Sequence, residues 1–163
     1  MYNNINPNII AAWGKFVFLY EIEKLSKKNE AELKNLFPNA VAFFEKKIMP
    51  LISLQDIVSK KTLLENTAFQ MAKVGSTGTG ITSFLRHMRN VFAHGKIDKS
   101  NEVYTIIDFE QNENEEGKLD NNVSAFGELP CTDVEQFFYH IINEFEKPEE
   151  QTHDGSTGSA SVN

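Results

Sequence analysis

The stretch LRHMRNVFAHGK, residues 85–96, has the pattern of an amphipathic helix that stops at a glycine. At about 100° per residue, its apolar side chains fall on one arc of the helix and its polar side chains on the other. The apolar arc, extended by one turn toward the N-terminus, holds Ile81, Phe84, Leu85, Met88, Val91 and Phe92. The polar arc holds Arg86, His87, Arg89, Asn90, Ala93 and His94. We therefore expect a helix that buries one face in a core and turns two arginines and two histidines toward solvent.

The residues before this helix predict three more helices. Asn6 and Pro7 are typical of an N-cap and a first helical position. A second helix should begin near Asn29 and bend or break at the Phe-Pro pair of residues 37–38. The sequence SLQD at residues 53–56 resembles a capping box, although an Asp replaces the usual Glu or Gln, and it predicts a third helix. The buried face of that third helix would hold Ile57, Leu64, Ala68 and Met71.

A glycine-rich segment, VGSTGTGIT at residues 74–82, leads into the helix that carries residues 85–94. It matches the glycine spacing of a phosphate-binding loop, but Ile81 takes the place of the lysine that must reach the phosphates. We also expect no hydrophobic strand before it, and such a loop needs one. We therefore interpret the segment as an exposed loop, with Thr82 or Ser83 capping the following helix.

After this helix the pattern changes from helical to alternating. Residues 103–109 alternate in polarity, and the polar loop QNENEEGKLDNN separates them from a second candidate strand, so we expect a β-hairpin over about residues 103–129. The sequence TDVE at residues 132–135 matches a capping box and should begin a strongly amphipathic last helix. The tail from residue 148 to residue 163 has almost nothing to bury and should be disordered.

Together these elements predict a mainly α fold, a bundle of four to five helices with a small β-hairpin inserted before the last helix. The chain of 163 residues is long enough for one well-packed domain, which we place at residues 1–147. Its 13 phenylalanines predict an aromatic core. The lone cysteine, Cys131, can form no internal disulfide, and no segment has the pattern of a leader peptide or a membrane span. A cytoplasmic protein without membrane contact is therefore expected.

Charge is distributed unevenly along the chain. The net charge of −7 alone argues against a polyanionic partner. Residues 1–100 hold 14 Lys and Arg against 8 Asp and Glu, whereas residues 101–163 hold 2 against 15. The first part therefore has the charge for a surface that binds nucleic acid, although ordinary solvated charge explains the same distribution equally well.

The polar arc has the residue types needed to cut RNA without a metal ion. Proton transfers at the 2′-hydroxyl and at the leaving 5′-oxygen need a group that titrates near neutral pH, which is the property of histidine. A cation must stabilise the charge that develops on the phosphate, and arginine matches phosphate geometry with two parallel N–H donors. The alternative is a merely solvated helix face with a histidine that complements the helix dipole. No metal and no cofactor are expected, because the histidines lack a metal-binding spacing such as HExxH.

The six residues RNVFAH, from Arg89 to His94, have the form R-N-x-x-x-H, which resembles the signature of the HEPN superfamily. These helical domains occur in many prokaryotic ribonuclease toxins and antiviral effectors. The surrounding FLRHMRNVFAHGKI is similar to prokaryotic members whose motif helix ends at His-Gly. The position of the motif late in a helical bundle, followed by a hairpin and a final helix, extends the resemblance over roughly residues 8–147, and it implies a HEPN-like bundle.

The resemblance also implies a function and its residues. Arg89 and His94 would be the catalytic pair, and Asn90 the polar residue that follows the arginine in the motif. Such domains typically dimerise with their motif helices face to face, which implies a homodimer with a composite, metal-independent site. The implied reaction cleaves RNA to 2′,3′-cyclic phosphate and 5′-hydroxyl ends. Beside the catalytic residues, the candidate RNA contacts are Arg86, His87 and Lys96. We expect His87 to lie at the surface or in an interface.

Two other functions stay open. A non-catalytic member of the same fold would act as a dimerising regulator or as the partner of a nucleotidyltransferase, because the same Arg and His can hold a phosphate without cleaving it. A plain helical interaction protein would have no nucleic-acid partner. For the nuclease, the expected role is that of a toxin or a phage-defence effector, with an antitoxin as a further possible partner.

Overall fold

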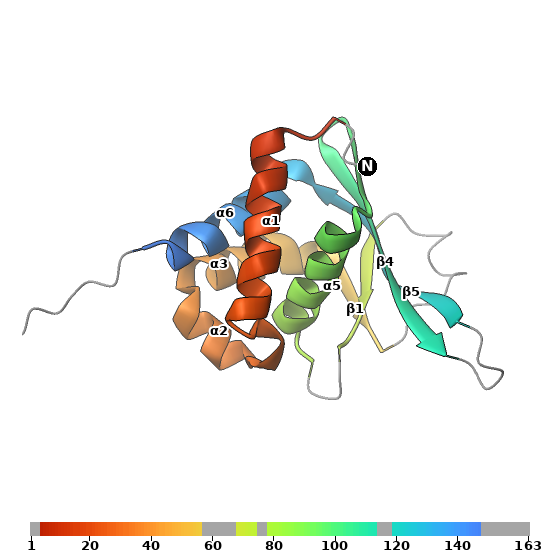
Figure 1. Ribbon diagram of the computed structural model, residues 1–163, viewed down its shortest axis with the longest axis horizontal. Coiled ribbons are helices and arrows are strands. Elements are labelled where there is room, and N and C mark those ends of the chain that lie inside the picture. The colour runs from red at the N-terminus through yellow and green to blue at the C-terminus, as the bar shows by residue number, and fades with distance from the viewer. Residues whose placement is uncertain (1–3, 57–67, 75–77, 114–118, 148–163) are drawn as a thin grey trace, which may run out of the picture.

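A computed structural model of the protein describes residues 4–56, 68–74, 78–113 and 119–147. The α-helices in this part of the chain are α1 (Pro7–Ile22), α2 (Glu30–Leu36), α3 (Pro38–Phe43), α5 (Gly80–His94) and α6 (Cys131–Phe145). A π-helical turn, Phe44–Ile48, follows α3 directly. The strands are β1 (Ile52–Gln55), β2 (Phe69–Ala72), β3 (Ile97–Ser100), β4 (Val103–Glu113) and β5 (Leu119–Pro130). None of the described helices is both long enough and apolar enough to cross a membrane. Figure 1 shows the helices gathered on one side of the strands.

The strands form one mixed sheet in the order β1-β2-β5-β4-β3. Strands β1 and β2 are parallel, and the other neighbouring pairs are antiparallel. The predicted hairpin is present as β4 and β5, but the prediction of a small hairpin is wrong, because β3 extends it on one side and β2 and β1 on the other. Both β1 and β2 have only four residues, a length at which a sequence pattern does not separate strand from helix.

The prediction of a helix that starts near residue 53 is wrong for the residues that the structure describes. The sequence SLQD lies in β1 and the residue after it. Met71, expected on the face of that helix, is fully buried in β2 instead. Two other members of that expected face, residues 57 and 64, lie outside the described residues. The glycine-rich loop is thus preceded by a strand after all, but Ile81 is buried in α5 and cannot take the role of a phosphate-binding lysine.

The first two helices begin as predicted. The side chain of Asn6 accepts a hydrogen bond from a first-turn amide of α1, and Pro7 takes the first helical position. Asn29 caps α2 in a capping box with Glu32, whose carboxylate accepts from the Asn29 amide at 2.8 Å. These local signals predicted both starts because they depend on residues within one helical turn.

The predicted break in the second helical segment is also present, at Phe37. Pro38 then begins α3 in the position that tolerates a missing amide hydrogen. The next two amides, of Asn39 and Ala40, donate to the carboxylate of Glu144 at 2.7 and 3.0 Å. A side chain of α6 therefore caps α3, and this long-range contact ties the two helices together.

Two predicted caps are wrong. Thr79, rather than Thr82 or Ser83, caps α5, and it forms a capping box with Thr82. The Ser83 hydroxyl instead accepts a hydrogen bond from the Val74 amide at 3.1 Å. Helix α6 begins at Cys131 without a side-chain cap, so the TDVE sequence lies inside the helix. Its early start follows from β5, which runs directly into α6 and leaves no loop for a cap.

The core between the helices and the sheet is aromatic, as the phenylalanine content predicts. Trp13 of α1 stacks on Phe92 of α5 with ring centroids 4.4 Å apart. Two turns earlier on the same arc of α5, Phe84 packs against Phe137 and Phe138 of α6. Helix α5 contacts α1, β2 and β4, so the predicted apolar arc of this helix lies at the centre of the fold.

Candidate functional site

Helix α5 carries the R-N-x-x-x-H motif and is fixed at both ends. The capping box of Thr79 and Thr82 satisfies its first turn. At the other end Gly95 has a φ of 65°, in the left-handed region that glycine enters without strain. The amides of Gly95 and Lys96 both reach back to the carbonyl of Val91. The helix therefore ends directly after His94, as predicted.

The predicted site residues differ in exposure. The exposed ones are Arg86, His94 and Lys96, and the half-buried ones are Arg89 and Asn90. His87 is only 3% exposed, so the prediction of a surface or interface histidine is wrong. On the helix His87 lies about 40° from Val91, which is buried, and the sheet covers this side of α5. We therefore remove His87 from the candidate RNA contacts.

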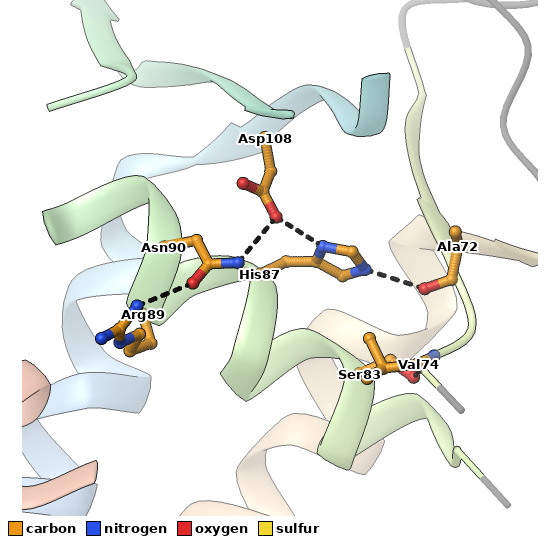
Figure 2. A network of polar contacts seen from close by, with 7 residues as sticks. All are labelled: Ala72, Val74, Ser83, His87, Arg89, Asn90 and Asp108. Atoms are coloured by element: carbon orange, nitrogen blue, oxygen red, sulfur yellow. Dashed lines mark hydrogen bonds and ion pairs between the residues drawn. The ribbon is translucent and has the colours of Figure 1, made fainter. Parts of the chain in front are cut away.

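His87 instead links three elements of the core (Figure 2). Its Nδ1 atom lies 2.8 Å from Oδ2 of Asp108 on β4, and its Nε2 atom lies 2.8 Å from the carbonyl oxygen of Ala72 in β2. A carbonyl and a carboxylate only accept hydrogen bonds. Each nitrogen of the imidazole is thus within hydrogen-bond distance of one oxygen, and His87 joins α5 to β4 and β2.

Asp108 also orders the motif. Its Oδ2 atom accepts a hydrogen bond from Nδ2 of Asn90 at 3.3 Å, and Oδ1 of Asn90 accepts one from Nη1 of Arg89 at 3.1 Å (Figure 2). These contacts fix which way the Asn90 amide points. A β-bulge lies beside Asp108, because Asp108 pairs with Ala125 and the next residue of β4 pairs with Val123. Bulges re-aim side chains next to functional sites, and this one lies where β4 meets the motif helix.

The guanidinium of Arg89 lies between α5 and α1. Its Nη2 atom is 2.6 Å from Oε1 of Glu21, and its side chain is 31% exposed. Its Nε atom is buried and has no hydrogen-bond partner within the part of the chain that the structure describes. Each terminal nitrogen of an arginine carries two hydrogens, so one donor on each stays open after the bonds to Glu21 and Asn90. The side chain is thus held by protein groups and still able to bind an anion.

His94 lies on the same helix as Arg89 but on another side of it. Five residues separate the two, which places them about 140° apart around the axis, whereas Asn90 and His94 are about 40° apart. The His94 side chain is exposed and forms no hydrogen bond with the described residues. One chain therefore places Arg89 and Asn90 in contact, and leaves His94 to face outward beside them.

Two residues of this arrangement, Asp108 and Glu21, escaped the sequence analysis. Asp108 lies on the same face of β4 as Tyr104 and Ile106, and both of these side chains are buried. An acidic side chain on the buried face of a strand needs a hydrogen-bond partner, and this position was the sequence signal for Asp108. Glu21 gave no signal, because only the packing of α1 on α5 brings it to Arg89.

Other chemistry has little support in the described residues. No three His, Cys, Asp or Glu side chains of this part of the chain are grouped so that they could hold a metal ion. Burial raises the pKa of the Cys131 thiol, so this cysteine is not activated as a nucleophile.

Comparison with known proteins identifies the family. A family model described as HEPN pEK499 p136 matches residues 1–152. No curated protein and no solved structure matches the chain. The matched residues run from before α1 to beyond α6 and include the whole motif helix. The predicted resemblance to the HEPN superfamily is confirmed, and the chain belongs to the HEPN pEK499 p136 family.

Proposed function

We propose that this protein is a metal-independent endoribonuclease whose site is built on Arg89, Asn90 and His94. The observation that carries the proposal is the continuous chain of contacts from Ala72 through His87, Asp108 and Asn90 to Arg89. The contacts hold the Arg89 and Asn90 side chains in place before a substrate binds. Catalysis by such groups costs little free energy of reorganisation, which favours electrostatic stabilisation of the transition state.

The proposed reaction divides the work between the arginine and the histidine. His94 accepts the proton of a 2′-hydroxyl, and the 2′-oxygen attacks the adjacent phosphorus. The bond between phosphorus and the 5′-oxygen breaks, and the leaving oxygen takes a proton from a second, protonated His94. Arg89 binds the non-bridging oxygens as their negative charge grows, and Asn90 keeps the guanidinium in position. The products are a 2′,3′-cyclic phosphate and a 5′-hydroxyl.

A homodimer would supply the second histidine. Because Arg89 and His94 point about 140° apart on α5, one helix alone does not surround a phosphate with both. Two α5 helices face to face would bring the arginine of one chain toward the histidine of the other. We propose such a composite site, in a toxin or an antiviral effector that acts on RNA in the cytoplasm, where an antitoxin or a nucleotidyltransferase would be a further partner.

Cleavage of a mixed RNA pool in excess EDTA tests the proposal. We expect the wild-type protein to produce cyclic-phosphate ends, and His94→Ala to cut roughly 10²-fold to 10⁴-fold more slowly, the usual loss for a general acid or base. Lys147→Ala, which removes an exposed charge at the end of α6, should cut like the wild type. Circular dichroism melts establish that all three proteins are folded. Equal cleavage by wild type and His94→Ala would overturn the assignment of His94.

A second candidate function is RNA or nucleotide binding without cleavage. The ion pair between Arg89 and Glu21 favours it, since a neutralised arginine stabilises a phosphorane less well. Tight RNA binding by the wild type without any new RNA ends would select this function.

A further inference from the structure

A polar pocket of 230 Å³ lies at the N-terminal end of α5, at the opposite end of the helix from His94. Its walls come from the end of α1, the segment 25–30 that follows it, Val74, Gly78 and Thr79 before α5, and the first two turns of α5. The lining residues that matter here are Tyr20, Lys27, Lys28, Thr79, Thr82 and Arg86. The pocket is therefore next to the motif but separate from it.

Positive charge dominates the lining of this pocket. It contains the three cations Lys27, Lys28 and Arg86, and one acid, Glu30. In the described part of the chain none of these cations forms an ion pair, in contrast to Arg89. An excess of unpaired positive charge on a concave surface attracts anions.

A mostly buried tyrosine lines the same pocket. Tyr20 is only 5% exposed, its ring packs against Phe16, and its hydroxyl makes no hydrogen bond with the described residues. Burial raises the pKa of Tyr20, and Arg86 and Arg89 lower it by a smaller amount. At neutral pH the hydroxyl is therefore protonated, and it can donate a hydrogen bond to an oxygen of a bound ligand.

The pocket size limits the ligand. Pockets that enclose a drug-sized molecule have roughly 300 to 1,000 Å³. A pocket of 230 Å³ is smaller, and it suits a phosphate group with part of its sugar better than a whole nucleotide. The hydroxyls of Thr79 and Thr82 are already bonded to each other's amides, so the side chains of Tyr20 and Arg86 are the better candidate contacts.

We propose that this pocket binds a second phosphate of the RNA, beside the phosphate held at Arg89, with Tyr20 and Arg86 as its main contacts. The proposal rests on the proposed function, which makes RNA the ligand. Arg86 precedes Arg89 by three residues, about 4.5 Å along the helix axis. Glu21, which pairs with Arg89 at 2.6 Å, is the next residue after Tyr20. A strand that places one phosphate at Arg89 would thus bring its neighbour to the pocket.

Binding of an uncleavable RNA tests the pocket separately from the chemistry. The probe is a fluorescein-labelled 2′-O-methyl RNA octamer, which lacks the attacking hydroxyl, and the readout is fluorescence anisotropy. Tyr20→Phe removes one oxygen and keeps the packed ring, and we expect Kd to rise roughly threefold to tenfold. Arg86→Ala should raise Kd about tenfold and lower the salt slope by about 0.7, the value for one phosphate contact on a single strand.

Matched controls lie outside the pocket. Tyr139→Phe removes an exposed hydroxyl from α6, and Lys147→Ala removes an exposed positive charge, so both should bind the octamer like the wild type. An octamer with a 5′-phosphate distinguishes the source of the ligand. If Tyr20→Phe weakens only the phosphorylated octamer, the pocket holds a terminal phosphate, and if it weakens both equally, it holds an internal phosphodiester.

The outcomes separate the two proposals. Wild-type affinity in folded Tyr20→Phe and Arg86→Ala, in a protein that cuts RNA, would overturn the pocket alone. Weaker binding in both variants, in a protein that cuts no RNA, would support the pocket and overturn the nuclease. A wild-type protein that binds neither octamer at low salt would overturn both.

Discussion

Nδ1 of His87 lies 2.8 Å from Oδ2 of Asp108, so the motif helix is joined inside the core to the strand that follows it. The two side chains are 4% and 6% exposed, and water cannot replace a lost partner easily. His87→Ala should lower the free energy of unfolding by about 3 to 5 kcal/mol, because the buried Asp108 loses its histidine partner and keeps the longer contact with Asn90. Urea denaturation measures the loss.

Asp98→Ala is the matched control for the acid of this pair. Asp98 is exposed on β3, and a surface substitution should change the free energy of unfolding by less than about 0.5 kcal/mol. We expect Asp108→Ala to be far more destabilising than Asp98→Ala. Equal losses would mean that the His87–Asp108 contact contributes little.

Glu21→Gln should strengthen RNA binding. The substitution removes the negative charge 2.6 Å from Nη2 of Arg89 and leaves an amide of similar shape. We expect Kd for the uncleavable octamer to fall roughly twofold to fivefold at low salt, and the gain to shrink as salt screens the charges. Glu45→Gln, an exposed acid after α3, removes the same charge elsewhere. A gain of the same size in Glu45→Gln would point to net charge instead of the release of Arg89.

Mixing wild-type and His94→Ala chains tests the composite site. Because the proposed reaction uses one His94 from each chain, a mixed dimer has no complete site. With random exchange of subunits, an equal mixture should cleave RNA at about a quarter of the rate of the same amount of wild type, because a quarter of its dimers are wild type. A rate of about one half after verified subunit exchange would mean that each chain carries a complete site of its own.

Alkaline pH should destabilise the protein. Burial raises the pKa of Cys131 above 9.0, and burial with the hydrogen bond to Glu135 raises the pKa of Tyr104 above 10.0. Above these ordinary values the unfolded chain releases protons that the folded chain keeps, so the free energy of unfolding falls as pH rises. Urea denaturation from pH 7.5 to pH 10.5 should show this fall, beginning at about pH 9.

Cys131→Ala separates the two contributions. It removes the thiol, so the part of the fall that begins near pH 9 should disappear, while the part above about pH 10 should stay. A pH profile identical to that of the wild type would show that the thiol titrates alike in the folded and unfolded chains.

The helices of this fold were largely predictable from the sequence. Their signals are local: Asn29 and Glu32 cap α2 within one turn, and Gly95 ends α5. Strands β1 and β2 were not predictable, since four residues of each gain their stability from neighbours such as β5. The predicted cap of α6 was wrong for a related reason. Strand β5 continues up to Pro130, so α6 begins at Cys131 without a capping side chain.

The candidate site was predictable only where it follows the motif. The pattern of residue types singled out Arg89, Asn90 and His94, but it placed His87 on the surface because it counted only the periodicity of α5. The sheet decides the burial of His87, because β2 and β4 supply both hydrogen-bond partners of the imidazole. An acid among buried residues of a strand, such as Asp108, was the one sequence signal of that contact.

The central position of β5 has a consequence for folding during translation. This strand joins β2 to β4, yet it is the last of the described strands to leave the ribosome, and only α6 follows it in the described chain. A nascent chain that ends after α5 carries the whole R-N-x-x-x-H motif but neither Asp108 nor the strand that completes the sheet. We therefore expect the ordered motif to form only late in translation, which would keep the site of the proposed ribonuclease unassembled while it is still surrounded by ribosomal RNA.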